Sequence, residues 1–257
     1  MNRRTFLATV SSLAAVDALP ALAAGSAGSV RTTSGTLPRK VIVGTVVQSF
    51  WGPYPGLGKR LEQLAGIVDQ MAAEAKKNYG RGLDLAILPE AAVTGETGED
   101  AAAHSVPFEG EVKEAFAGKA REHSCYIVVP TYLLESNAKK TCSNAAVLVG
   151  RKGEVLGAYR KVHLVVSLER GTMEGGATPG EALPVFECDF GKLGLQICYD
   201  MEFGEGWAEL ARRRAELIAW PTQSRICRSH FWSTTPASAT RAVSPSWQPT
   251  GCARWWS

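Results

Sequence analysis

Three residues of types used in covalent catalysis follow three separate apolar segments of the chain. Cys198 comes directly after the apolar run 193–197, at the entrance of a predicted strand-to-helix turn. A cysteine at such a turn projects its thiol from the end of a sheet, where nearby amide groups and charges can activate it. Glu90 follows the apolar run 83–88, and Lys161 follows the segment 155–159. Taken singly, they also fit a helix-start carboxylate, a surface cation and a buried apolar thiol.

The chemistry of a thiol nucleophile can make use of the other two residue types. A thiol with a pKa of about 8.5 needs a base or a cation to become a thiolate at neutral pH. Glutamate can take the thiol proton, and a preorganised ammonium group stabilises a developing oxyanion by about 3–4 kcal/mol. Glu90 and Lys161 also offset each other's cost of burial if they share one pocket. We therefore expect the ends of the three side chains to converge within hydrogen-bonding or ion-pairing reach.

The elements that must position these residues alternate at first between strand and helix, and strands then cluster. Apolar patterns predict helices at 58–78, 111–123 and 207–216, and strands at 40–48, 83–88, 125–133, 143–150, 155–159, 183–189, 191–198 and 217–220. The first helix has one buried stripe and is closed by Gly80; the stripe is Leu61, Leu64, Val68, Met71 and Ala75. The segment 160–176 is predicted to be mostly loop. This order predicts a layered α/β fold with sheets packed between helices.

The order Glu90, Lys161, Cys198 resembles the nitrilase, or carbon–nitrogen hydrolase, superfamily. The motifs LPE, YRKVHL and GLQICYD carry the resemblance, which covers about residues 40–224, and Glu169, eight residues after the lysine, fills a fourth family position. The resemblance implies a four-layer αββα sandwich. It also implies a thioester mechanism in which Cys198 is the nucleophile and Glu90 the general base. Lys161 is then the oxyanion stabiliser, and Glu169 positions the substrate or supports the base. A homo-oligomer without metal or cofactor is implied as well.

The expected substrate is a small-molecule amide or N-carbamoyl compound, cleaved at a non-peptide carbon–nitrogen bond. Tyr199 and Asp200 after the cysteine resemble the amidase and carbamoylase branches, whereas the nitrile-cleaving branch usually has Trp-Glu there. Three alternatives stay open: a nitrile-cleaving nitrilase, a binding module without turnover, and a non-catalytic relative that keeps the residues but cannot complete the fold. His163 is predicted to stabilise its loop by hydrogen bonding rather than to act as a base.

Residues 1–30 are predicted to be a twin-arginine-type signal peptide and linker. Arg3 and Arg4 precede an Ala/Leu/Val run that contains Asp17 and Pro20, and a small-x-small cleavage pattern ends at Ala23. The run is too short and too interrupted for stable membrane insertion. We therefore expect export in folded form to the periplasm, with a carbon–nitrogen hydrolase domain at 39–224.

The range 225–257 differs in composition from the rest of the chain. It has no Asp, Glu or Lys but holds four of the seven tryptophans. No helical or strand period persists through it, so we expect an irregular, non-family tail and a fold that is incomplete at the C-terminus. A truncated or frame-shifted chain of this kind is expected to be inactive or prone to aggregation. A genuine irregular tail is the alternative.

The overall composition excludes several other classes of protein. Hydrophobic residues make up 45% and charged residues 21%, which is ordinary for a globular domain. The net charge of +3 and the lack of a basic stripe argue against a nucleic-acid partner. Six cysteines are scattered without the paired spacing of a zinc site or a disulfide scaffold.

Overall fold

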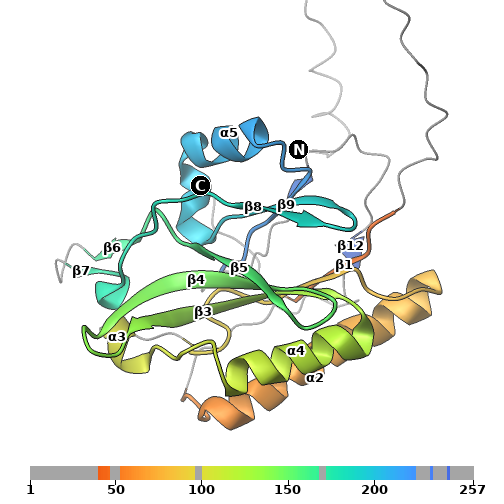
Figure 1. Cartoon of the computed structure of the whole chain (residues 1–257), viewed down its shortest axis with the longest axis horizontal. Helices are drawn as coiled ribbons and strands as arrows, with labels where there is room; N and C mark the ends of the chain where they lie inside the picture. The colour runs from red at the N-terminus through yellow and green to blue at the C-terminus, as the bar shows by residue number, and fades with distance from the viewer. Residues whose placement is uncertain are drawn as a thin grey trace, which may run out of the picture. The chain divides into compact units, whose positions relative to one another are not determined.

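Two β-sheets pack face to face, with helices on their outer faces (Figure 1). The structure, a computed structural model, describes residues 40–46, 53–95, 100–165 and 174–223, with the backbone of 166–167, 172–173, 232–233 and 242–243. Within these residues the larger sheet has six strands in the order β12-β1-β2-β3-β4-β5, and the smaller has four in the order β11-β10-β9-β8.

The six-stranded sheet is parallel on one side and antiparallel on the other. Its strands are β1 (Val43–Thr45), β2 (Leu85–Ile87), β3 (Tyr126–Ser136), β4 (Thr141–Val149), β5 (Val155–Arg160) and β12 (Ala242–Val243). The pairs β12–β1, β1–β2 and β2–β3 are parallel, and β3–β4–β5 is an antiparallel meander. Strands β2 and β5 therefore run in the same direction, and their carboxyl ends lie at the same edge of the sheet.

The four-stranded sheet comes from the second half of the chain. It contains β8 (Val185–Cys188), β9 (Gly191–Leu195), β10 (Leu217–Ala219) and β11 (Trp232–Ser233). Between β5 and β8, the strands β6 (Val166–Ser167) and β7 (Thr172–Met173) form a small hairpin, followed by the 3₁₀ turn η1 (Glu174–Gly176). The prediction of mostly loop at 160–176 therefore missed two short pairing segments.

Helices α2 (Leu57–Tyr79) and α4 (Glu111–His123) cover the outer face of the six-stranded sheet (Figure 1). The predicted stripe of α2 is confirmed, because all five of its residues are buried. Gly80 ends the helix with φ of 69° and an amide that donates to the Lys76 carbonyl, a conformation that favours glycine. The four-residue helix α3 (Ala101–His104), which apolar periodicity did not indicate, begins where the Asp100 carboxylate accepts from the Ala103 amide.

A second core fills the space between the two sheets. Its buried side chains include Leu85, Val128, Leu148, Leu193, Leu195 and Ile197. On the far side of the smaller sheet, helix α5 (Gly204–Arg212) packs Leu210 against Ala215 and Ile218. The layers are therefore helix, sheet, sheet, helix, which confirms the predicted αββα architecture.

The last predicted helix, at 207–216, is shifted in the structure. Helix α5 starts at Gly204, directly after the extended residue Phe203, and ends at Arg212. Arg214 adopts φ of 61°, a left-handed conformation that stops the helix. The turn lets Ala215 fold back, with its amide on the Leu210 carbonyl. Tertiary packing of Ala215 therefore overrides the continued helical pattern of the sequence.

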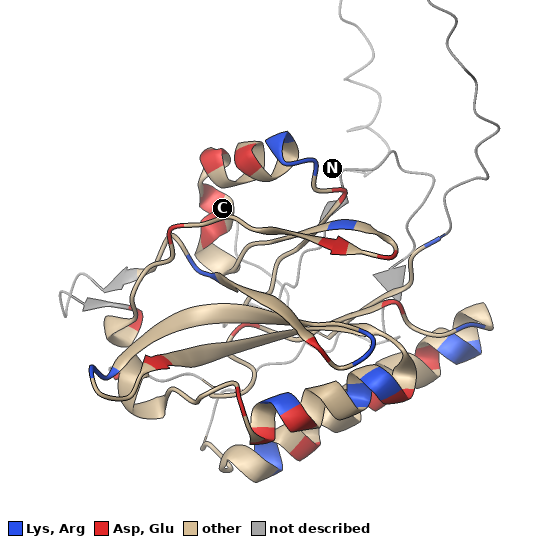
Figure 2. Cartoon of the chain, in the orientation of Figure 1, with Lys and Arg blue, Asp and Glu red and all other residues tan. Residues whose placement is uncertain are grey.

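Charged side chains of both signs are interspersed along α2 and α4 (Figure 2). Examples are the pairs Lys113–Glu109 and Lys119–Asp69. In the part of the chain that the structure describes, no helix combines the length and apolar character needed to cross a bilayer.

Two short pieces of the range 225–257 pair with the sheets. β11 lies antiparallel to β10, and β12 lies parallel to β1. The rest of this range, like residues 1–39, lies outside the described residues, so the irregular tail and the signal peptide stay predictions.

Polar contacts join the two sheets at the amino ends of β2, β5 and β9. The Arg151 guanidinium bonds Asp84, which precedes β2, at 2.8 Å, and Asp189, in the β8–β9 turn, at 2.7 Å. Arg151 also lies over the Tyr126 ring, 5.0 Å from its centroid. We call these four residues the inter-sheet clamp.

Replacing Arg151 with methionine is expected to lower the free energy of unfolding by about 1–2 kcal/mol, because the buried Asp84 carboxylate loses one of the two guanidinium groups, those of Arg151 and Arg81, that pair with it. Urea or thermal unfolding measures the effect. The matched control is Arg212→Met, which removes an exposed pair with Glu209 and should leave the unfolding midpoint unchanged. Equal midpoints for the two variants would show that the clamp adds no stability.

Candidate active site

The three residues predicted to converge follow the carboxyl ends of β2, β5 and β9. Glu90 follows β2, Lys161 directly follows β5, and Cys198 follows β9. The inter-sheet clamp lies at the starts of the same three strands, so the strands run in a common direction and end at a common edge. Glu90 and Lys161 are 71 positions apart in the sequence, and Cys198 follows a strand of the other sheet. The structure therefore brings together residues from distant segments.

Cys198 occupies a strained turn at the start of the 3₁₀ segment η2 (Cys198–Glu202). Its φ of 46° is in the left-handed region, which a residue with a Cβ adopts at a cost of about 1–3 kcal/mol. Its amide donates to the Pro221 carbonyl at 2.9 Å, and the Trp220 indole donates to its carbonyl at 2.8 Å. The segment that follows β10 therefore holds the backbone of the cysteine on both sides.

Glu90 is a buried carboxylate that accepts hydrogen bonds from several donors. Its Oε1 accepts from Lys161 Nζ at 3.0 Å and from Asn144 Nδ2 at 2.9 Å. Its Oε2 accepts from the Gln223 amide at 3.0 Å, and the Cys198 thiol also hydrogen-bonds the carboxylate. Glu90 is thus oriented from three directions with the thiol as a fourth neighbour.

Lys161 is almost completely buried, at 1% exposure, between two carboxylates. Its ammonium group contacts Glu90 and also Glu174, the first residue of η1. Burial alone would lower the pKa of Lys161, but the attraction of Glu90 and Glu174 outweighs it and raises that pKa. The lysine is therefore a fixed positive charge in the site.

Glu174 is a site residue that the sequence reasoning missed. Its carboxylate accepts from Asn144 Nδ2 at 3.0 Å and from the Val165 amide at 3.0 Å, and it contacts Lys161. Glu169, the predicted fourth residue, lies outside the described residues, so its role stays a prediction. The sequence signal that could have indicated Glu174 is the pair of glycines that follows it. Gly175 and Gly176 both adopt positive φ in the structure and turn the chain after Glu174.

Asn144 on β4 joins the two carboxylates and was also missed. Its Nδ2 donates to both Glu90 and Glu174, and its Oδ1 is buried without a hydrogen-bond partner. The backbone brings it there, because its carbonyl accepts from the Lys161 amide at 2.8 Å and continues the β4–β5 ladder. An asparagine within a strand carries no sequence signal of this role, which depends on register.

The Cys198 thiol is neutral in the resting site. Burial raises its pKa to about 12, and the charge and hydrogen bond of Glu90 act in the same direction, whereas Lys161 opposes them. Glu90, Glu174 and Lys161 therefore all act on the thiol, and only the lysine favours its ionisation. The arrangement is a thiol poised on a carboxylate acceptor rather than a preformed thiolate–cation pair.

His163 is confirmed as a loop-stabilising residue. Its Nδ1 lies 3.1 Å from the Asp200 carboxylate, its Nε2 lies 3.4 Å from Glu205, and its ring stacks on Phe203 at a centroid distance of 3.7 Å. The contacts with Asp200 and Phe203 hold the segment after Lys161 against η2, and Glu205 is an exposed neighbour.

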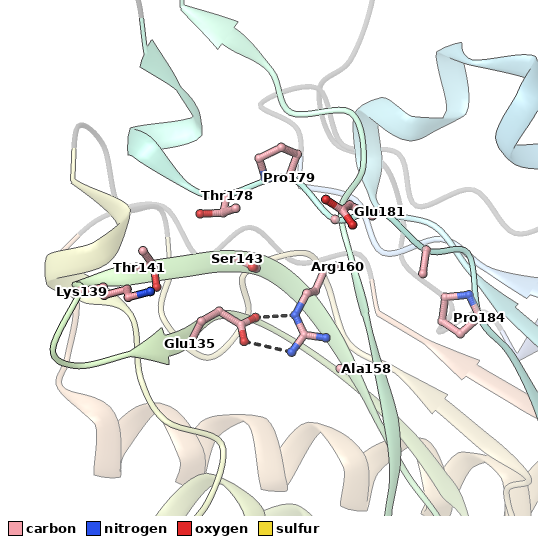
Figure 3. A pocket seen from close by; sticks show the side chains of 12 residues that line it. Glu135, Lys139, Thr141, Ser143, Ala158, Arg160, Thr178, Pro179, Glu181 and Pro184 are labelled. Carbon is pink, nitrogen blue, oxygen red and sulfur yellow. Dashed lines mark hydrogen bonds and ion pairs between the residues drawn. The ribbon is translucent and has the colours of Figure 1, made fainter.

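A separate pocket of about 600 Å³ lies on the opposite face of β4 and β5 (Figure 3). Ser143 and Arg160 line it, whereas their neighbours Asn144 and Lys161 bond Glu90 on the other face, since successive strand residues alternate between faces. Arg160 is paired with Glu135 across this pocket, with Nη2 3.0 Å from Oε2. The pocket is therefore distinct from the candidate active site.

One group of possible metal ligands lies elsewhere, on α2 and α4. Asp69, Glu122 and His123 are close together, but Lys119 already bonds both Asp69 and Glu122. The candidate active site likewise contains its own cation, Lys161, between Glu90 and Glu174. Neither arrangement resembles an open metal site.

Comparison with known proteins gives consistent similarities. The family model described as carbon-nitrogen hydrolase matches residues 53–246. A nitrilase of Pyrococcus abyssi is 35% identical over 159 residues, covering 60% of this chain and 56% of its own. A deaminated glutathione amidase of Rattus norvegicus is 33% identical over 150 residues, covering 55% and 46%. The chain thus spans about half the length of the curated relatives it matches.

Solved structures share the fold. A carbon–nitrogen hydrolase from Helicobacter pylori G27 superposes with a TM-score of 0.58 and 22% identity, covering 72% of this chain and 60% of its own. A cysteine-to-serine mutant of an amidase from Nesterenkonia sp. AN1, of the nitrilase superfamily, gives a TM-score of 0.56 and 26% identity, covering 73% and 68%.

Proposed function

The chain belongs to the carbon–nitrogen hydrolase family, and on this premise we propose that it hydrolyses small-molecule amides or N-carbamoyl compounds through a thioester on Cys198. The observation that carries the proposal is the buried pair of Glu90 and Lys161, 3.0 Å apart, which acts electrostatically on the Cys198 thiol. Nucleophile, base and cation are then within reach of one reacting carbon.

The first half-reaction forms the thioester. Sulfur of Cys198 attacks the carbonyl carbon as its proton passes to Glu90, and Lys161 stabilises the negative charge that develops on the carbonyl oxygen. The carbon–nitrogen bond then breaks, and the proton on Glu90 leaves with the nitrogen as ammonia or amine. The raised pKa of Cys198 supports this order, because the proton stays on sulfur until a substrate is attacked.

The second half-reaction hydrolyses the thioester and regenerates the free thiol. Water attacks the thioester carbon while one of its protons passes to Glu90, and the sulfur leaves and regains that proton. Glu174 and Asn144 keep Lys161 and Glu90 in place during both steps, since each contacts a reacting group through a short polar bond. Glu90 therefore accepts and returns one proton in each half-reaction.

The substrate class rests on the residues after the nucleophile. Tyr199 and Asp200 support an amide or N-carbamoyl substrate, as does the similarity to an amidase, whereas the similarity to a protein named nitrilase supports a nitrile as the second candidate. In all three substrate classes the thiol would attack an electrophilic carbon that is bonded to nitrogen.

A substrate panel tests the proposal. The 257-residue protein is incubated with short aliphatic amides, N-carbamoyl amino acids and aliphatic nitriles, and ammonia and the organic product are measured. A truncated fold would be inactive, but because β11 and β12 pair with the two sheets we expect ammonia from an amide or an N-carbamoyl compound, and none from a Cys198→Ala variant. Release from nitriles alone would favour the second candidate. No release from any class by protein that is folded by circular dichroism would contradict the proposed function.

We also propose export through the twin-arginine route, on the basis of Arg3, Arg4, Phe6 and Leu7. Replacing both arginines with lysine is expected to leave the protein unprocessed in the cytoplasm, because the receptor reads the pair itself. Cell fractionation with N-terminal sequencing measures this, with cleavage after Ala23 expected in the parent. Unchanged export of the double variant would show that another route is used.

A further inference from the structure

Asp200 is a buried carboxylate whose two oxygens are both fully engaged. It is 1% exposed. Its Oδ2 accepts from the Tyr159 hydroxyl at 2.6 Å and from the Ile197 amide at 2.9 Å. Its Oδ1 accepts from the His163 amide at 2.8 Å and lies 3.1 Å from His163 Nδ1. Four contacts converge on one side chain that the proposed reaction does not use.

These donors come from two segments, each with a proposed catalytic residue at its centre. Tyr159 and His163 lie two positions before and two positions after Lys161. Ile197 precedes Cys198, and Asp200 itself is two positions beyond that cysteine. The Asp200 carboxylate therefore links the lysine segment to the cysteine segment through direct hydrogen bonds.

The two segments otherwise belong to different sheets. Lys161 is held by the β4–β5 ladder through its amide, and Cys198 is held by the segment after β10 through its own amide. The inter-sheet clamp fixes the sheets at the other ends of the strands. At the active-site end, a small change in sheet spacing would alter the separation of thiol and ammonium, and Asp200 lies where it can prevent that change.

We infer that Asp200 is a positioning residue that sets the geometry of Cys198 relative to Lys161 by bonding both of their segments. The inference rests on the proposed function for its catalytic meaning. Tyr159 acts with it: its buried hydroxyl donates to Asp200 and accepts from the Val162 amide at 3.3 Å. Burial and the Asp200 charge raise the pKa of Tyr159, so the phenol remains a donor.

Asparagine cannot replace this aspartate without a conflict. An amide has one acceptor oxygen and one NH₂ group, whereas each oxygen of Asp200 faces a backbone N–H, from Ile197 or from His163. Either orientation of the amide places two donors against each other, and a backbone N–H cannot become an acceptor. One of the two segments must move, so Asp200→Asn tests position while keeping volume.

The experiment measures the reactivity of Cys198 without requiring turnover. Iodoacetamide alkylation of the peptide containing Cys198 is followed by mass spectrometry across about pH 6–11, and kcat and KM are measured on the best substrate of the panel. Variants are Asp200→Asn and Tyr159→Phe. The matched control is Glu205→Gln, which removes the exposed carboxylate at the other ring nitrogen of His163.

For Asp200→Asn we expect kcat to fall by about 100-fold with a smaller change in KM, the scale of a displacement of about 1 Å. Its alkylation profile should move to lower pH, since a displaced thiol is less buried and farther from Glu90. Tyr159→Phe should give the same changes at about a tenth of the size, and Glu205→Gln should match the parent.

Normalisation to the folded fraction separates positioning from stability alone. If folded Asp200→Asn or Tyr159→Phe protein has the parental kcat and alkylation profile, the inference is wrong. Should Asp200→Asn fail to fold, Tyr159→Phe decides by itself. If the parent hydrolyses nothing in the panel, the proposed function fails, but the alkylation profiles still test the position of the thiol.

Discussion

Replacement of Cys198 with alanine is expected to abolish hydrolysis, lowering kcat by about 10⁵–10⁶-fold, the scale seen when the nucleophile of a catalytic triad is removed. The thioester cannot form without the sulfur, and the remaining cation and carboxylate have no attached group to activate. Cys198→Ser should be nearly as inactive, because a hydroxyl is far harder to deprotonate than a thiol at the same carboxylate.

The alanine variant should remain folded. The backbone of residue 198 is held through its amide by the Pro221 carbonyl and through its carbonyl by the Trp220 indole, and alanine keeps both groups. Ammonia release and thermal unfolding measure both effects. The matched control is Cys188→Ser, at the turn end of the β8–β9 hairpin, which should keep full activity. Appreciable thiol-independent turnover by the alanine variant would remove Cys198 from the mechanism.

Replacing Glu90 with glutamine is expected to have opposite effects on catalysis and on thiol ionisation. Hydrolysis should fall by about 10²–10⁴-fold, because no group takes the proton from sulfur or from water. The thiol itself should ionise more easily. Burial, the negative charge of Glu90 and its acceptance of the thiol hydrogen bond raise the pKa of Cys198 to about 12. The substitution removes the contribution of the charge, whereas a glutamine oxygen can still accept a hydrogen bond.

The sign of the second effect follows from the charges that remain. A neighbouring negative charge disfavours a thiolate, so its removal lowers the thiol pKa, and Lys161 stays to stabilise the anion. Each unit by which the pKa falls increases the thiolate fraction about tenfold at pH values below it. Iodoacetamide should therefore modify Cys198 faster in the variant at neutral pH, even though hydrolysis is slower.

Alkylation rates and ammonia release are measured on the same preparations. Glu187→Gln, an exposed carboxylate on β8 paired with Lys192, is the control and should change neither rate. Slower alkylation in the Glu90 variant would mean that the carboxylate activates the resting thiol. An unchanged rate of hydrolysis would mean that another group is the base.

Much of the framework could be predicted from local patterns. The stripe of α2 and its end at Gly80 follow from the 3.6-residue period and from the ease with which glycine adopts positive φ. The end of α5 could not be predicted in this way, since the packing of Ala215 on Leu210 and Ile218 decides it. The hairpin β6–β7 is too short to produce any period.

The sequence by itself determined that Glu90, Lys161 and Cys198 follow strands, because apolar runs and the residues that follow them are local properties, and the family resemblance selected these three as candidates. Only the tertiary structure decided which side chains meet them. Asn144 reaches both carboxylates through the register of β4 on β5, and Glu174 reaches Lys161 through the course of a loop. Asp200 joins two segments from different sheets. Such contacts depend on the relative placement of distant segments, which no local pattern encodes.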